Sequence, residues 1–185
     1  QEIEEFLVGY LRANPGPCFP QILTSITYLD PRSESLKFFD KYMTTANSEL
    51  ENVLTDDSKR VPLCANSGTA GSGKTMMLRL VCAHFENKYK GKAIYITFNG
   101  KHAATQGIDK DLDPAARIAL RVLMAISTNS PRLKGFIDDL CAKCSRVKLG
   151  ITLSTGNTLS RIVRRVLGLN AKTPLLLAID ELRKM

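Results

Sequence analysis

Apolar residues recur every three or four positions along several stretches of the chain, which is the spacing of helices that bury one face. The longest stripe follows Asp30-Pro31, where an N-capping side chain precedes proline at the first helical position, and it consists of Leu36, Phe39, Met43, Ala46, Leu50 and Val53. An earlier helix is expected to end near Leu11 or Arg12, before a cluster of Asn, Pro and Gly. We therefore predict a helical N-terminal segment over residues 1–59 that packs on the core, with partner binding by the stripe as the alternative.

Four further helices are predicted downstream. One follows Lys74 and buries Met76, Met77, Leu80, Val81 and either His84 or Phe85. A second opens at Asp113-Pro114 and buries Ile118, Ala119, Val122, Leu123 and Ile126. A third is expected over residues 131–146, followed by a short extended piece or turn over residues 150–156. The last is expected to be capped by Asn157 and to end at Gly168.

Uninterrupted apolar runs are typical of strands buried on both faces, as in a parallel sheet covered by helices. Three strands are expected: a short apolar run over residues 61–65, a second strand over residues 93–100, and a third, continuous apolar run over residues 174–179 that is expected to be buried on both faces. Pro62 lies near the start of the first run, where a strand tolerates a missing N–H donor. Strands that alternate with helices predict an α/β fold.

The composition fits one globular core, since 44% of the 185 residues are hydrophobic and 24% are charged. No apolar run approaches the length of a membrane span, and the acidic N-terminal residues do not resemble a secretory signal.

Five cysteines without the density of a disulfide scaffold favour reduced thiols in an intracellular protein, cytoplasmic or nuclear, although a signal removed before Gln1 is compatible with a secreted effector. Cys141 and Cys144 have metal-ligand spacing, but no second pair lies near enough in sequence for a zinc site, so helix-borne thiols are favoured.

Eight consecutive residues fit the phosphate-binding pattern G-x-x-x-x-G-K-[ST], namely Gly68, Thr69, Ala70, Gly71, Ser72, Gly73, Lys74 and Thr75. Glycines let backbone N–H groups converge on phosphate oxygens, and the helix that follows points its positive end at the same anion. Lys74 is predicted to reach the β- and γ-phosphates of a nucleotide. The hydroxyl of Thr75 is predicted to ligate the Mg²⁺ that bridges them.

The third apolar run ends in two adjacent carboxylates, Asp180 and Glu181. In an open parallel sheet, ligands bind at the carboxyl ends of the strands, which is where both acids are expected. Asp180 is predicted to hold Mg²⁺, directly or through water. Glu181 is predicted to orient the water that attacks the γ-phosphate.

With both motifs the chain resembles the P-loop NTPases, and the adjacent acids resemble those of the ATPase division that includes AAA+ and STAND proteins. The resemblance covers about residues 60 to 181 and implies a three-layer α/β/α parallel sheet. It implies that residues 68–75 bind the phosphates, that Thr75 and Asp180 hold the metal, and that Glu181 and Lys74 act in catalysis. No Asn-Lys-x-Asp motif for reading guanine occurs in the sequence, which favours ATP.

A second resemblance is to the ATPase domain shared by the Crinkler effectors of oomycetes and the retrotransposon-hot-spot proteins of trypanosomes. It rests on the lead-in from Arg32 to Phe39, on the loop after Val61-Pro62-Leu63 and on residues 93–100.

The chain departs from the P-loop pattern in two ways. Lys74 and Asp180 lie 106 positions apart, more than one strand and one crossover helix require, so an insertion is expected. The sequence also stops at Met185, before the strand on which this family carries its sensor residue. We therefore expect residues 60–185 to form an incomplete P-loop core that belongs to a larger protein, with a helical insertion at about residues 131–172.

Charge is unevenly distributed. Residues 1–60 carry 6 basic and 10 acidic side chains, whereas residues 131–172 carry 9 basic and 2 acidic ones. A basic face can contact nucleic acid, an acidic protein surface or a neighbouring subunit. No stacking aromatics interleave with these basic residues, so a solvated helix face is the slightly favoured interpretation.

The sequence thus predicts ATP binding and Mg²⁺-dependent ATP hydrolysis. One alternative is a nucleotide-operated switch that controls a protein partner or a homo-oligomer with little turnover. Another is an ATP-driven remodeller that contacts nucleic acid through residues 131–172.

Overall fold

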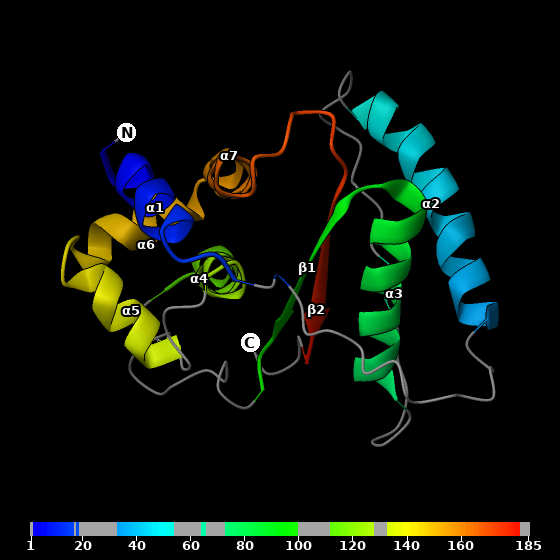
Figure 1. Cartoon of the computed structure of the whole chain (residues 1–185), viewed down its shortest axis with the longest axis horizontal. Helices are drawn as coiled ribbons and strands as arrows, with labels where there is room; N and C mark the ends of the chain where they lie inside the picture. Colours follow the sequence, from blue (N-terminus) through cyan, green and yellow to red (C-terminus); the bar gives the residue numbers. More distant parts are fainter. Residues whose placement is uncertain are drawn as a thin grey trace.

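The computed structural model of the chain describes residues 2–16, 18, 33–53, 64–65, 73–99, 112–127 and 133–181. Within them the protein is a mixed α/β structure, mostly helical, with a small two-stranded parallel sheet packed between helices (Figure 1). The described elements are, in chain order, α1 Glu2–Arg12, α2 Ser33–Val53, α3 Lys74–Tyr89, β1 Lys92–Thr97, α4 Pro114–Ala125, α5 Leu133–Cys141, α6 Arg146–Ser154, α7 Gly156–Leu167 and β2 Leu175–Asp180.

The sheet joins the second and third apolar runs predicted from sequence. Strands β1 and β2 are parallel, and their register pairs Lys92 with Leu175 at one end and Thr97 with Asp180 at the other. Parallel strands require a crossover between them, and here α4, α5, α6 and α7 occupy it. The carboxyl ends of both strands therefore meet at one edge of the sheet.

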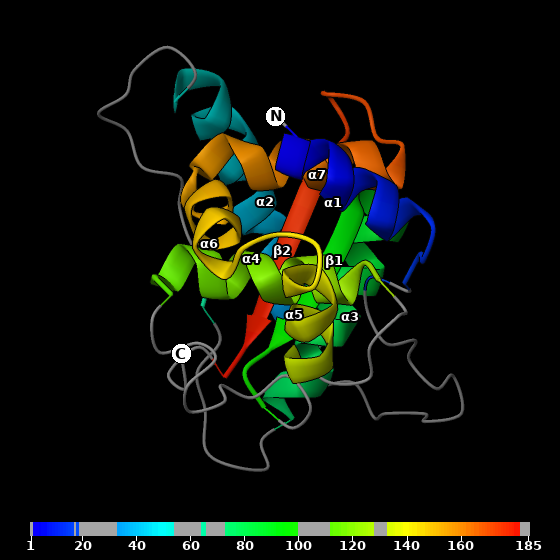
Figure 2. The ribbon, with the colours of Figure 1, turned by 90° about the vertical axis from the view of Figure 1, so that its left-hand side faces the viewer.

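One face of the sheet is covered by α4, and α1, α5, α6 and α7 surround α4 (Figure 2). Asp113 caps α4 by accepting a hydrogen bond from the backbone N–H of Ala116, with Pro114 at the first position, as predicted. Ala119, Leu120 and Leu123 of this helix are fully buried in the larger hydrophobic core. This core holds α1 and the crossover helices against β1.

The other face is covered by α3, with α2 packed outside it (Figure 1). Phe39 and Met43 of the predicted α2 stripe are buried with Phe85 of α3 in a second hydrophobic cluster. A polar contact joins the same two helices, because Asp40 of α2 accepts hydrogen bonds from Lys88 and Tyr89 of α3 at 2.6 and 2.8 Å. These hydrogen bonds, together with one to His84, outweigh the effect of burial and lower the pKa of Asp40 to about 2. The expectation that the stripe packs on the core is confirmed for its described side chains.

Two predictions between residues 131 and 156 are wrong. The expected single helix over residues 131–146 ends at Cys141, and a turn separates it from α6. Ser145 starts α6, since its hydroxyl accepts a hydrogen bond from the N–H of Lys148. The expected extended piece is instead the C-terminal half of α6, because Leu149 and Leu153 lie one turn apart and are both buried in the larger core.

Other details also differ from the predictions. Helix α7 ends as predicted, with Gly168 in the left-handed region at φ 65°, but its N-cap is Thr155 rather than Asn157. Of the expected strand over residues 61–65, only Cys64 and Ala65 lie within the described residues, and both are exposed and outside any strand.

Strand β2 is less buried than its apolar run predicts. Leu177 is 41% exposed, and only Ala178 and Asp180 of this strand are buried. A strand buried on both faces needs helices over both of them. Among the described helices, α3 packs on both strands, whereas α4 packs mainly on β1, so the α4 side of β2 is less covered. None of the described helices is both long enough and apolar enough to span a membrane.

Candidate functional site

The first turn of α3 contains the end of the predicted phosphate loop. Gly73 has a φ of 79°, in the left-handed region where a side chain would add strain, and its carbonyl accepts the hydrogen bond of Met77 that starts the helix. Lys74 and Thr75 are therefore the first two residues of α3. Residues Gly68–Ser72 lie outside the described part of the chain.

The structure brings Thr75 and Asp180 into direct contact. Asp180 is the last residue of β2 and only 7% of it is exposed. The hydroxyl of Thr75 donates a hydrogen bond of 2.8 Å to Oδ2 of Asp180, across 105 positions of sequence. Figure 1 shows the start of α3 at the edge of the sheet where both strands end. Thr75 and Asp180 belong to different sequence motifs, and each motif predicts a metal ligand. The structure places both residues in one site.

A third residue, Tyr95 of β1, joins this contact and was not predicted. Its hydroxyl also donates a 2.8 Å hydrogen bond to Oδ2 of Asp180. The side chain is 7% exposed, and burial, followed by the hydrogen bond to Asp180, raises its pKa well above the usual value. A phenol is protonated at neutral pH even with its usual pKa, so Tyr95 is a donor there. The only sequence signal for it was its position in an apolar strand two residues before the strand end.

Glu181 and Lys74 lie next to the contacting residues. Glu181 directly follows Asp180 and has a φ of 58°, an uncommon conformation for a residue with a side chain. Lys74 directly precedes Thr75, and both Lys74 and Glu181 are partly buried. Strained backbone is found preferentially at functional sites, so the conformation of Glu181 agrees with a role for this residue.

The chemistry of the site is that of hard oxygen ligands. Thr75 contributes a hydroxyl and Asp180 a carboxylate, and these are groups that Mg²⁺ prefers. The N-terminus of α3 lies beside them, and the positive end of a helix favours an anion. A buried carboxylate, hydroxyl donors and a helix N-terminus together suit a metal-bound phosphate.

The two cysteines with metal-ligand spacing lie elsewhere. Cys141 ends α5 and Cys144 follows in the turn, and burial raises the pKa of both thiols. Cys144 contacts the carbonyl of Leu140 at 3.3 Å. The described part of the chain contains no group of three or more His, Cys, Asp or Glu side chains that could hold a metal ion.

Part of the predicted basic region faces the acidic N-terminal helix. Arg161 and Arg165 of α7 form ion pairs of 2.8 Å with Glu4 and Glu5 of α1, respectively. These contacts lower the pKa of both carboxyl groups despite the opposing effect of burial. The third arginine of α7, Arg164, donates to the carbonyls of Asn170 and Thr173 in the loop before β2. The arginines of α7 therefore make their contacts largely with other groups of the protein.

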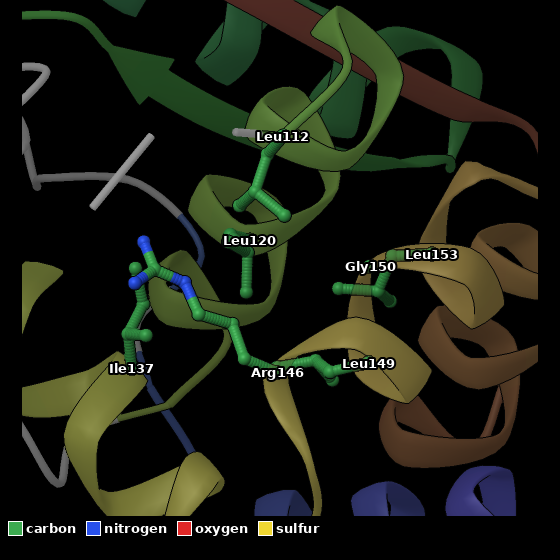
Figure 3. A pocket seen from close by; sticks show the side chains of 7 residues that line it. All are labelled: Leu112, Leu120, Ile137, Arg146, Leu149, Gly150 and Leu153. Carbon is green, nitrogen blue, oxygen red and sulfur yellow. The ribbon is translucent and has the colours of Figure 1, made fainter. Parts of the chain in front are cut away.

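A small hollow lies between α4, α5 and α6, away from the contact of Thr75 with Asp180 (Figure 3). Figure 3 shows Arg146 extending along it toward Ile137. Apart from Arg146 its lining is apolar or glycine, so it lacks the convergent polar groups of a ligand site. The residues that line it are Leu112, Leu120, Ile137, Arg146, Leu149, Gly150 and Leu153.

Comparison of the chain with family models, curated proteins and solved structures gives no match.

Proposed function

We propose that this protein binds ATP with Mg²⁺ at the edge of the sheet where α3 begins and β2 ends, and that it hydrolyses the γ-phosphate. The observation that carries the proposal is the 2.8 Å contact between Thr75 and Asp180. Each residue belongs to a separate sequence motif, and each motif predicts a ligand for the same metal. A chance glycine-rich loop gives no reason for its threonine to lie on the acid that ends a distant parallel strand.

The proposal includes the finer fold expected from sequence, a P-loop core with a three-layer α/β/α arrangement. Its support is the parallel pairing of β1 with β2, with α3 on one face and α4 on the other. Backbone N–H groups of residues 68–73 would bind the phosphates, and Lys74 would place its charge on the β- and γ-phosphates. Glu181 would accept a hydrogen bond from the attacking water and hold it in line.

The residues present fit Mg²⁺. Thr75 and Asp180 offer oxygen donors at one point, and Asp180 is buried with two hydroxyl donors that stabilise its charge. When bound, Mg²⁺ would neutralise charge on the phosphates and polarise the γ-phosphoryl group. The other contributions to catalysis would come from residues of the chain, which would orient the phosphates, exclude part of the solvent and position a water molecule.

Of the alternatives, nucleic-acid remodelling receives the least support. Two arginines of α7 pair with Glu4 and Glu5, which leaves less positive charge on that helix for phosphate contacts. The switch alternative shares the same nucleotide site and differs from the ATPase only in turnover.

Substitution of the loop lysine tests the proposal. Lys74→Ala is expected to weaken ATP binding about 10- to 100-fold in a fluorescence or calorimetric titration, because a charged hydrogen bond contributes about 1.5–3 kcal/mol. Lys134→Ala, at an exposed position of α5, serves as the matched control and should bind like the wild type. Equal affinity of the wild type and Lys74→Ala would remove the proposed phosphate site.

A further inference from the structure

The register of the sheet explains how Tyr95 reaches Asp180. Tyr95 pairs with Ala178 and Thr97 pairs with Asp180, so Tyr95 and Asp180 are diagonal neighbours on one face of the sheet. Diagonal neighbours lie within reach of a long aromatic side chain. The phenol bridges this separation and ends 2.8 Å from Oδ2 of Asp180.

Tyr95 is held by its backbone and by the packing of its ring. Its backbone N–H donates to the carbonyl of Cys18 at 3.0 Å, so the residue is anchored from outside the sheet as well as within it. Its ring is buried in the cluster that includes Phe39 and Phe85, and the guanidinium of Arg79 lies 5.7 Å from the ring centroid. These contacts restrict the position of the Tyr95 hydroxyl.

Thr75 and Tyr95 donate to the same oxygen of Asp180 from different elements. One donor would leave the carboxylate free to rotate about its terminal torsion, which is soft for aspartate. Two donors on Oδ2 restrict the rotation of the carboxylate and therefore the position of Oδ1. If Thr75 turns its oxygen toward a metal ion, the bond from Tyr95 still holds Asp180.

We propose that Tyr95 is a positioning residue that holds the carboxylate of Asp180 in the orientation required to receive Mg²⁺. This inference rests on the proposed function and names a residue that the sequence motifs do not contain. Groups that orient a metal ligand typically change metal affinity 10- to 100-fold when they are removed. The effect should therefore appear in the Mg²⁺ requirement of nucleotide binding.

Tyr95→Phe tests this inference, because it removes one oxygen and keeps the buried ring. ATP binding is measured with a fluorescent ATP analogue at fixed protein concentration while Mg²⁺ is added. The Mg²⁺ concentration at which the Mg²⁺-dependent increase in binding is half complete is expected to rise about tenfold. Binding of the analogue in EDTA should stay within about twofold of the wild type, since Tyr95 acts only through the metal ligand. Circular dichroism and thermal unfolding establish that the variant is folded.

Tyr89→Phe is the matched control. Tyr89 also donates a 2.8 Å hydrogen bond to an aspartate, Asp40, but at the opposite end of α3. It should leave the Mg²⁺ requirement unchanged. A similar shift in both variants would indicate general loosening of α3 and would overturn the inference.

A double-variant cycle shows whether Tyr95 acts through Asp180. In an Asp180→Asn background, Tyr95→Phe should cause no further loss in the ratio of the ATP affinity with Mg²⁺ to the ATP affinity in EDTA, because the oriented carboxylate is already lost. Additive effects would contradict the inference, as would a wild-type Mg²⁺ requirement in Tyr95→Phe. If the wild type itself binds ATP without any dependence on Mg²⁺, the proposed function fails instead, so the two failures are distinguishable.

Discussion

Thr75, Tyr95 and Asp180 reach one another for different physical reasons. Thr75 is fixed by the first turn of α3, which depends on the left-handed conformation of Gly73. Asp180 is fixed as the last residue of a parallel strand. Thr75 and Asp180 could be predicted because residue types and spacing identify them, whereas the contact of Tyr95 depends on a cross-strand register that the sequence does not specify.

Substitution of Glu181 distinguishes the proposed ATPase from the alternative nucleotide-operated switch. Glu181→Gln keeps the size of the side chain and removes its ability to accept a proton, so ATP binding should persist while turnover falls about 100-fold or more. Glu34→Gln, at an exposed position of α2, is the control. Phosphate release from pre-bound Mg²⁺-ATP measures the difference. Unchanged turnover in Glu181→Gln would refute its assigned role, and a wild type that binds but never releases phosphate would support the switch.

Elements formed as predicted where local signals agreed with tertiary packing. Asp113-Pro114 began α4 and Gly168 ended α7, because cap chemistry acts within one turn. The prediction of an extended piece or turn over residues 150–156 is wrong because Ile151 and Thr152 favour extended backbone locally, and the burial of Leu149 and Leu153 reverses that preference. Periodicity over so short a segment cannot reveal which face another helix will cover.

The junction between α3 and β1 allows a test of how these two elements pack. A Cβ at Gly91 would lie 2.3 Å from the buried ring of Phe85 and 2.8 Å from the carbonyl oxygen of Pro174, which precedes β2. Gly91→Ala should therefore destabilise the protein by about 1–3 kcal/mol through overpacking. That corresponds to a fall of roughly 3–10 °C in Tm, measured by calorimetry.

Gly9→Ala is the matched control, because a Cβ there meets no atom within 4 Å and Gly9 lies in the exposed part of α1. It should leave Tm unchanged or raise it, since alanine favours a helix by up to about 1 kcal/mol over glycine. Equal Tm values for both variants would show that Gly91 does not make the close approach described here.

At the scale of the whole molecule, ion pairs connect segments that are distant in sequence. Helix α1 closes on α7 through Glu4–Arg161 and Glu5–Arg165, so the acidic N-terminal segment and the basic region compensate each other in part. The uneven charge could be read from the sequence, but this pairing could not, because 157 positions separate Glu4 from Arg161. The same long-range folding brings Thr75 to Asp180, and the proposed function depends on that contact.

The Mg²⁺ dependence of ATP affinity in the wild type and in Asp180→Asn is the most direct test of the proposed Mg²⁺–ATP site. Calorimetric titration of ATP with Mg²⁺ and with EDTA should show tighter binding with Mg²⁺ for the wild type, by about tenfold or more, because the proposed function has Thr75 and Asp180, which are in contact, hold the metal at the phosphates. Asp180→Asn should lose most of that difference while its affinity in EDTA stays near the wild-type value. Equal affinities with Mg²⁺ and EDTA in the wild type, or an undiminished difference in Asp180→Asn, would contradict a metal–nucleotide site at the end of β2.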